Sequence, residues 1–135
     1  LAFVVATANN ISNLPPELMR KGRFDEIFYV DFPNQSEREK IASLHIGKRR
    51  RQDLAQIDIA ALAKKLDGYC GADIESVVRD GIEAAFVAGK EHVTTEDLQA
   101  AIRRTHPISE TMKDAIESMA KTYKSKKFTN ASREA

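Results

Sequence analysis

The spacing of the apolar residues changes at Pro33, and this change divides the chain into two kinds of structure. Before Pro33, two short runs rich in β-forming residues, 1–6 and 26–32, predict strands joined by a loop and a short helix. After Pro33, apolar residues recur at helical spacing. The sequence therefore predicts an α/β piece at 1–33, a helical bundle at 34–106, and a C-terminal helix with a polar tail at 107–135.

Helix-start signals place the first helices of the bundle. Ser36 followed by Glu39 has the spacing of a capping box and predicts a helix that reaches about His45. The basic run at 48–51 is then expected to be a solvated connection. Asp58 is the expected N-cap of a short second helix.

The later helices have clearer signals. The strongest helical periodicity belongs to six apolar residues, Ile74, Val77, Val78, Ile82, Ala85 and Phe86. Thr94 with Asp97 predicts the start of the next helix, and Pro107 is expected to end it. A last amphipathic helix is predicted at 112–123, followed by a polar tail that frays from Lys124.

Composition excludes several classes of protein. The 135 residues carry a formal net charge of +1, which requires neither nucleic acid nor a membrane as a partner. The single cysteine, Cys70, excludes a disulfide framework and favours a reducing compartment. The sequence has no paired Cys or His residues at metal-ligand spacing, so we expect no zinc site. No apolar run approaches the ~20 residues of a membrane span. The chain opens inside an apolar run without Met, so we expect it to be a piece of a longer protein.

Three motifs carry a resemblance to a known family. "FVVATAN", "LPPELMRKGRFDEIFYVDFP" and "GYCGADI" resemble, in order and spacing, the second half of an AAA-family ATPase module of the AAA+ superfamily, over about residues 1–105. "TANNISNLPPELMRKGRFDEIF" and the tail "HPISETMKDAIESMAKTYKSKKF" are similar to the AAA ATPases of algal plastid and cyanobacterial genomes and their bacterial relatives. The resemblance implies two strands and a short helix of the large P-loop subdomain, followed by the helical lid.

The resemblance implies catalytic roles for three residues. Asn9 falls at the sensor-1 position, where a short amide holds the attacking water, although Asn10 lies one position away. Arg20 and Arg23 match the arginine-finger pair, whose guanidinium forks reach into a neighbouring subunit's nucleotide site. The alternatives are a loop asparagine bonded to its own backbone and surface arginines at a helix end. Gly22 between the arginines predicts a tight turn that fixes both cations.

Three further residues are implied to bind the nucleotide. Gly71 and Ala72 match a small pair at the start of a lid helix, where the backbone lies close to the base. His45 matches a histidine near the adenine or ribose. The alternative for Gly71 and Ala72 is that they only mark the start of a helix, with Asp73 in its first turn complementing the helix dipole. The alternative for His45 is a structural role at a helix end.

Motifs that the sequence lacks limit the expected function. It contains no G-x-x-x-x-G-K-[ST] and no apolar strand ending in paired acids. We therefore expect ATP and Mg²⁺ to serve the longer protein, with no cofactor bound to this chain alone and no hydrolysis by it. The longer protein would remodel a protein or other macromolecule as a homo-oligomeric ring, with a hexamer expected, in the cytoplasm or the plastid stroma.

Two alternatives remain for the function. The chain is a helical adaptor if the longer protein has lost its catalytic motifs. A membrane-anchored AAA protease would need an H-E-x-x-H motif after the lid, and the sequence has none. In the family's sheet a further strand separates the two predicted here, so we expect residues 1–33 to be rearranged, disordered or paired with another copy, and the helical part to fold alone.

Overall fold

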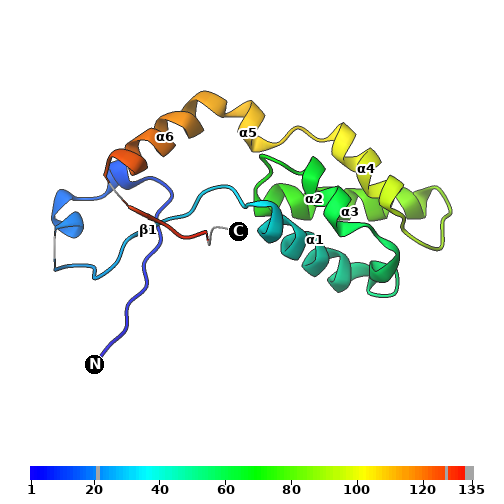
Figure 1. The fold of residues 1–135 in the computed structure, drawn as a ribbon, viewed down its shortest axis with the longest axis horizontal. Helices are drawn as coiled ribbons and strands as arrows, with labels where there is room; N and C mark the ends of the chain where they lie inside the picture. Colours follow the sequence, from blue (N-terminus) through cyan, green and yellow to red (C-terminus); the bar gives the residue numbers. More distant parts are fainter. Residues whose placement is uncertain (21, 127, 133–135) are drawn as a thin grey trace.

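The computed structural model describes residues 1–20, 22–126 and 128–132 (Figure 1). In chain order the α-helices are α1 (Gln35–Arg50), α2 (Ile59–Lys65), α3 (Gly71–Val87), α4 (Thr95–Arg104), α5 (Ile108–Thr111) and α6 (Lys113–Ser125). Three 3₁₀ turns lie at Ile11–Asn13, Pro16–Met19 and Leu54–Gln56, and two short strands are β1 (Phe28–Tyr29) and β2 (Thr129–Asn130).

Helices α1 to α4 form a bundle with one hydrophobic core. Its most buried large side chains, none more than 2% exposed, include Ile46, Leu62, Leu66, Ile74, Val77, Val93 and Leu98. The predicted helical face at 74–85 is confirmed, because its residues all belong to this core. Phe86 was expected there too, but that prediction is wrong: its ring is 43% exposed and contacts the guanidinium of Arg50 at 4.8 Å.

The start and the end of α1 both differ from the prediction. Asn34, rather than Ser36, is the N-cap: its side chain accepts from the Glu37 amide at 2.9 Å, and the Glu37 carboxylate accepts from the Asn34 amide at 2.9 Å. The helix also runs past His45 to Arg50, so most of the basic run at 48–51 forms its last turn. Cations there are favourable because the helix dipole is negative at its C-terminal end.

The other helix starts agree with the sequence. The Asp58 side chain accepts from the Ala61 amide at 3.0 Å and caps α2. Thr94 and Asp97 form the capping box of α4. Pro107 lies between α4 and α5, so the predicted break is confirmed.

The N-terminal segment holds less strand than predicted. Residues 1–6 form no strand, and Leu1, Phe3, Val4 and Val5 are all at least 71% exposed, so that prediction is wrong. A strand needs a partner for its backbone hydrogen bonds, and none is supplied to this run. The short helix before the arginines is confirmed as the 3₁₀ turn at Pro16–Met19, and the strand predicted at 26–32 is reduced to β1.

The C-terminal tail supplies the partner of β1. Strand β2 pairs with it in parallel, with Phe28 opposite Thr129 and Tyr29 opposite Asn130. The prediction that the tail frays from Lys124 is therefore wrong for this stretch. In Figure 1, α5 and α6 arch from the bundle back to β1, so β2 lies beside the N-terminal segment.

Candidate functional site

The predicted catalytic residues all lie in the exposed N-terminal segment. Asn9, Arg20 and Arg23 are each exposed. The turn predicted between the arginines is present: the Arg23 amide donates to the Arg20 carbonyl at 3.2 Å, and Gly22 has a φ of 95°, a conformation that favours glycine. The turn therefore holds both arginine backbones in a defined relation, with their side chains on the surface.

The predicted nucleotide-binding residues lie on two packed helices. His45 is on α1, and Gly71 and Ala72 begin α3. Glu75, one turn further along α3, connects the two helices: its Oε1 lies 3.7 Å from His45 Nδ1. The structure therefore brings His45 close to Glu75 on α3, the helix that Gly71 and Ala72 begin.

Sequence reasoning missed the ion pair at this junction. Arg49 Nη2 donates to Glu75 Oε1 at 2.9 Å, and Arg49 Nη1 lies 3.4 Å from His45 Nδ1. The hydrogen bond from Arg49, followed by the charge of His45, lowers the pKa of Glu75. His45 and Arg49 are four residues apart, which puts them on one helix face, and this spacing was the available signal.

The Asp73 side chain occupies the N-terminus of α3. Asp73 Oδ2 accepts from the Cys70 amide at 3.3 Å and from the Cys70 thiol at 3.2 Å. It also accepts from the Ile108 amide at 3.2 Å, which joins α3 to α5. The prediction that Asp73 complements the helix start is confirmed. Burial is the main cause that raises the pKa of the Cys70 thiol, so it remains protonated and unreactive at neutral pH.

The backbone at Gly71 is open on one side. A Cβ placed on Gly71 would meet no atom within 4 Å, apart from its immediate chain neighbours and its own helix backbone. Gly71 is partly exposed and Ala72 is exposed. At the position of a Gly71 Cβ, the described part of the chain therefore leaves open space, and whether a nucleotide base occupies it stays a prediction.

The two groups of predicted residues are not joined. Within residues 1–20, 22–126 and 128–132, no hydrogen bond or ion pair links Asn9, Arg20 or Arg23 to the junction of α1 and α3. The roles of all six residues stay predictions. A separation of this kind is compatible with arginines that act on another subunit.

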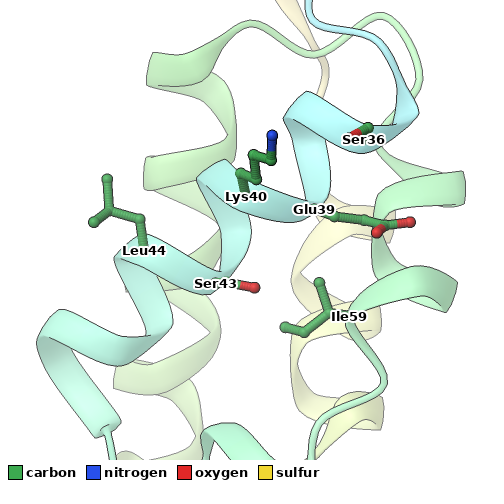
Figure 2. A pocket seen from close by; sticks show the side chains of 6 residues that line it. All are labelled: Ser36, Glu39, Lys40, Ser43, Leu44 and Ile59. Carbon is green, nitrogen blue, oxygen red and sulfur yellow. The ribbon is translucent and has the colours of Figure 1, made fainter. Parts of the chain in front are cut away.

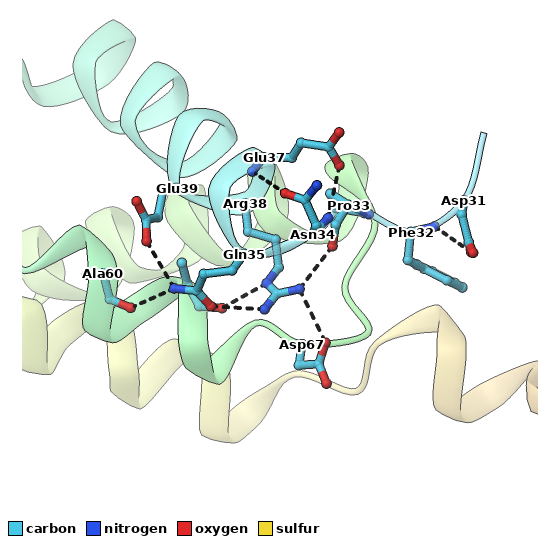
Figure 3. Close-up of polar contacts among 11 residues, drawn as sticks. Asp31, Phe32, Pro33, Asn34, Gln35, Glu37, Arg38, Glu39, Ala60 and Asp67 are labelled. Atoms are coloured by element: carbon cyan, nitrogen blue, oxygen red, sulfur yellow. Dashed lines mark hydrogen bonds and ion pairs between the residues drawn. The ribbon is translucent and has the colours of Figure 1, made fainter. Parts of the chain in front are cut away.

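A buried arginine fixes the entry into the bundle (Figure 3). Arg38 is 7% exposed and donates to the carbonyls of Ala63 at 2.8 Å and Pro33 at 2.9 Å. It also contacts Asp67 at 3.2 Å and Gln35 at 3.1 Å. The guanidinium therefore ties the segment before α1 to α2. Sequence reasoning missed it, although Arg38 shares helical spacing with the buried residues Ala42 and Ile46.

A buried carboxylate closes the opposite end of the bundle. Asp53 is 0% exposed, and its oxygens lie 2.8 Å from His92 Nδ1, 3.1 Å from the Val93 amide and 2.9 Å from Arg50 Nε. Burial alone raises the pKa of Asp53, but the hydrogen bonds from these three groups outweigh it and lower the pKa to about 2. Asp53 is therefore ionised at neutral pH, and its contacts give it a structural role.

A surface groove runs between α1 and the start of α2 (Figure 2). It has a volume of about 660 Å³ and is lined by Ser36, Glu39, Lys40, Ser43, Leu44 and Ile59. None of the six predicted site residues lines it. Its open shape differs from the enclosed clefts in which small ligands usually bind.

Neither a metal centre nor a membrane helix occurs in the described part of the chain. Over residues 1–20, 22–126 and 128–132, no three His, Cys, Asp or Glu residues are grouped so that they could hold a metal ion. Over the same ranges, no helix has the length and apolar character needed to cross a bilayer.

Comparison with known proteins identifies the helical bundle. Residues 56–100 match the family model of the AAA+ lid domain, and this stretch runs from before α2 into α4. The chain carries an AAA+ lid and is a C-terminal part of an AAA-family module. The resemblance derived from the sequence motifs is thereby confirmed at the level of the family.

Relatives with two different names illustrate this comparison. The chain is 43% identical over 117 residues to the uncharacterized AAA domain-containing protein ycf46 of Pyropia yezoensis, which covers 87% of this chain and 24% of that protein. The ycf46 protein of Guillardia theta is 40% identical over 117 residues, covering 87% and 23%. The ATP-dependent zinc metalloprotease FtsH 2 of Petrotoga mobilis is 37% identical over 102 residues, covering 75% and 16%. The chain thus spans about a quarter or less of these relatives.

Proposed function

We propose that the chain supplies the lid, the sensor-1 residue and the arginine fingers of a ring-forming AAA ATPase. The observation that carries this proposal is the AAA+ lid match at residues 56–100, which follows the Arg20–Arg23 turn in the order expected of the module. The longer protein binds ATP and Mg²⁺ and couples hydrolysis to the remodelling of a protein or other macromolecule. It works as a homo-oligomeric ring, a hexamer by family likeness.

Arg20 and Arg23 act in trans in this proposal. A guanidinium is always charged and presents a planar fork of donors to phosphate oxygens. A loose phosphoryl-transfer transition state spreads charge over these oxygens and is stabilised by cations placed beforehand. The exposed turn at Gly22 suits this role, because both side chains are accessible to a neighbouring subunit. Asn9 orients the attacking water within its own subunit.

The junction of α1 and α3 holds the nucleoside in this proposal. The open backbone at Gly71 and Ala72 receives the base, and His45 lies against the base or the ribose. The chain itself has no phosphate-binding loop and no paired acids for Mg²⁺. We therefore expect this chain alone to be inactive, with ATP bound tightly only by the longer protein. By likeness to the ycf46 proteins, we assign it to the cytoplasm or the plastid stroma.

The experiment that tests the proposal mixes subunits of the longer protein. Wild-type subunits are doped with increasing fractions of an Arg20→Ala/Arg23→Ala variant, and the ATPase rate is measured. If the arginines act on a neighbour, the rate falls with the mutant fraction, while the pure variant binds ATP but does not hydrolyse it. An Arg103→Ala/Arg104→Ala variant is the matched control, because these two arginines on α4 are also close together in the sequence and exposed.

Two results would overturn the proposal. If the double variant hydrolyses ATP at the wild-type rate, the arginine-finger assignment is wrong. If the wild-type protein has no ATPase activity, the helical adaptor becomes the better explanation of the chain. A loss of activity in the Arg103→Ala/Arg104→Ala control as well would show that any pair of lost cations has this effect.

A further inference from the structure

The C-terminal segment is attached to the bundle at its first end. The Ile108 amide donates to Asp73 Oδ2 at 3.2 Å. Ser109 lies against Gly68, where an added Cβ would come within 2.8 Å of the Ser109 hydroxyl. Gly68 also has a φ of 78°, so another residue is disfavoured there for two reasons. Helix α5 therefore begins against the loop and the first turn of α3.

The same segment is attached to β1 at its other end by aromatic rings. Tyr123, in the last turn of α6, is only 8% exposed. Its ring centroid lies 4.7 Å from that of Tyr29 in β1 and 6.1 Å from that of Phe128. Both separations are typical of favourable aromatic pairs. Burial is the main cause that raises the pKa of Tyr29, which agrees with a ring that is withdrawn from water.

Backbone and side-chain hydrogen bonds extend this attachment to the start of the bundle. Beyond the parallel pairing of β1 with β2, the Ala131 amide donates to the Tyr29 carbonyl at 2.8 Å. The Ser132 hydroxyl donates to Glu37 Oε2 at 3.1 Å, and Glu37 belongs to the capping box of α1. The tail therefore contacts both sides of the short connection at 30–34 that joins β1 to α1.

Between these two ends lie α5 and α6, which are interrupted at Met112. Helix α6 has 13 residues, which corresponds to a length of about 20 Å. An α-helix resists stretching because its hydrogen bonds run along its axis. Because the segment is attached at both ends and most of its length is helical, it limits how far the two parts that it joins can move apart.

We propose that residues 108–126 and 128–132 form a strut that holds the strand segment with β1 in a fixed orientation relative to the lid bundle. Without it, the connection at 30–34 would be the covalent hinge between the two parts. The strut does not depend on the proposed ATPase function, because its contacts involve none of the predicted catalytic or nucleotide-binding residues. In an ATPase it would limit how far the lid turns about that hinge.

The aromatic contact is the decisive one. A two-residue strand pair is too short to be stable by itself, since isolated hairpins of much greater length are only marginally stable in water. Met119 is on the same helix as Tyr123 but is 38% exposed. The strut should therefore fail when Tyr123 is truncated and survive when Met119 is.

The experiment measures one distance between the two parts in the 135-residue chain. Spin labels are attached to Asp25→Cys, in the strand segment, and Glu83→Cys, on α3, both of which are exposed. Cys70→Ser removes the native thiol and supplies a residue that is preferred at N-caps. We expect a single narrow distance distribution, its loss in Tyr123→Ala, and its retention in the matched control Met119→Ala.

Two further measurements keep the test decisive. Tyr123 is not part of the hydrophobic cluster of the bundle, so Tyr123→Ala should leave the thermal transition of the bundle unchanged. Phe128→Ala removes the outer ring without touching α6 and should also broaden the distribution. The proposal is overturned if the wild-type distribution is already broad, or if it stays narrow in both Tyr123→Ala and Phe128→Ala.

Discussion

Replacing Arg38 by methionine should destabilise the lid bundle. Methionine keeps most of the apolar stem of arginine, so packing is largely preserved and the hydrogen bonds are lost. Arg38 donates to two backbone carbonyls, those of Ala63 at 2.8 Å and Pro33 at 2.9 Å. The change therefore isolates the contribution of a buried guanidinium to the junction of α1 and α2.

The magnitude follows from what remains after the substitution. A hydrogen bond to a charged group contributes about 1.5–3 kcal/mol. Both bonds to backbone carbonyls are lost, together with the contacts to Asp67 and Gln35. The loss is partly offset because methionine does not require a buried charge to be desolvated. The Ala63 carbonyl also keeps the Leu66 amide at 3.3 Å as a partner. We expect a net loss of about 2–4 kcal/mol in the free energy of unfolding.

Two matched variants separate the buried from the exposed interactions of this arginine. The ion pair of Arg38 with Asp67 reaches a carboxylate whose side chain is 87% exposed. Asp67→Asn should therefore cost less than about 1 kcal/mol, as exposed ion pairs do. Arg38→Lys keeps the charge but loses the planar fork, so its cost should fall between those of the other two variants.

Urea unfolding followed by circular dichroism measures these differences. With a slope of about 1 kcal/mol per molar urea for a small domain, Arg38→Met should lower the midpoint by about 2–4 M. The reasoning is refuted if Arg38→Met lies within about 0.5 kcal/mol of wild type. It is also refuted if Asp67→Asn costs as much as Arg38→Met, because the exposed pair would then carry the effect.

Three further predictions concern the same bundle. The pKa of Asp53 is lowered to about 2, so its contribution to stability should be complete above about pH 5 and be lost as the pH falls toward 2. The urea midpoint should therefore fall with pH in this range, and Asp53→Asn should make this fall smaller. Asn34→Ala should cost about 1 kcal/mol by removing the cap of α1, whereas Ser36→Ala should cost almost nothing; equal costs would contradict the observed cap. Gly71→Leu should leave the urea midpoint nearly unchanged, because no atom crowds the Cβ position. It should weaken the binding of ATP to the longer protein, measured by calorimetry. Unchanged affinity would argue against contact between the nucleotide base and Gly71.

Local signals were sufficient for most of the helices. Asp58 and Thr94 cap helices whose hydrogen bonds all lie within a few residues, so the sequence around each start contains the needed information. The start of α1 was harder because Asn34–Glu37 and Ser36–Glu39 have the same capping-box spacing. In the structure Asn34 is the cap, and Arg38, four residues later, donates to the Ala63 carbonyl on α2.

Buried charges could not be placed from the sequence because their partners are distant along the chain. The Arg38 guanidinium meets a carbonyl 25 residues away, and the Asp53 carboxylate meets an amide 40 residues away. A charged residue at core spacing is ordinarily taken as solvent-exposed. Of the candidate site, the sequence located the Gly22 turn and the position of Gly71 at a helix start, but not Arg49 and Glu75, which pair across two helices.

The strands show why the two halves of the candidate site differ in how well they can be tested. A helix satisfies its own backbone, whereas a strand forms only beside a partner. The run at 1–6 has the stronger β pattern yet remains exposed, while the polar stretch at β2 forms a strand because β1 lies beside it. The geometry around Asn9 therefore depends on a neighbour for the run that precedes it. The junction of His45 and Gly71 is already built by packed helices. The folding cost of substitutions at that junction can be measured in this chain, whereas the catalytic roles proposed for Asn9, Arg20 and Arg23 can be tested only in the longer protein.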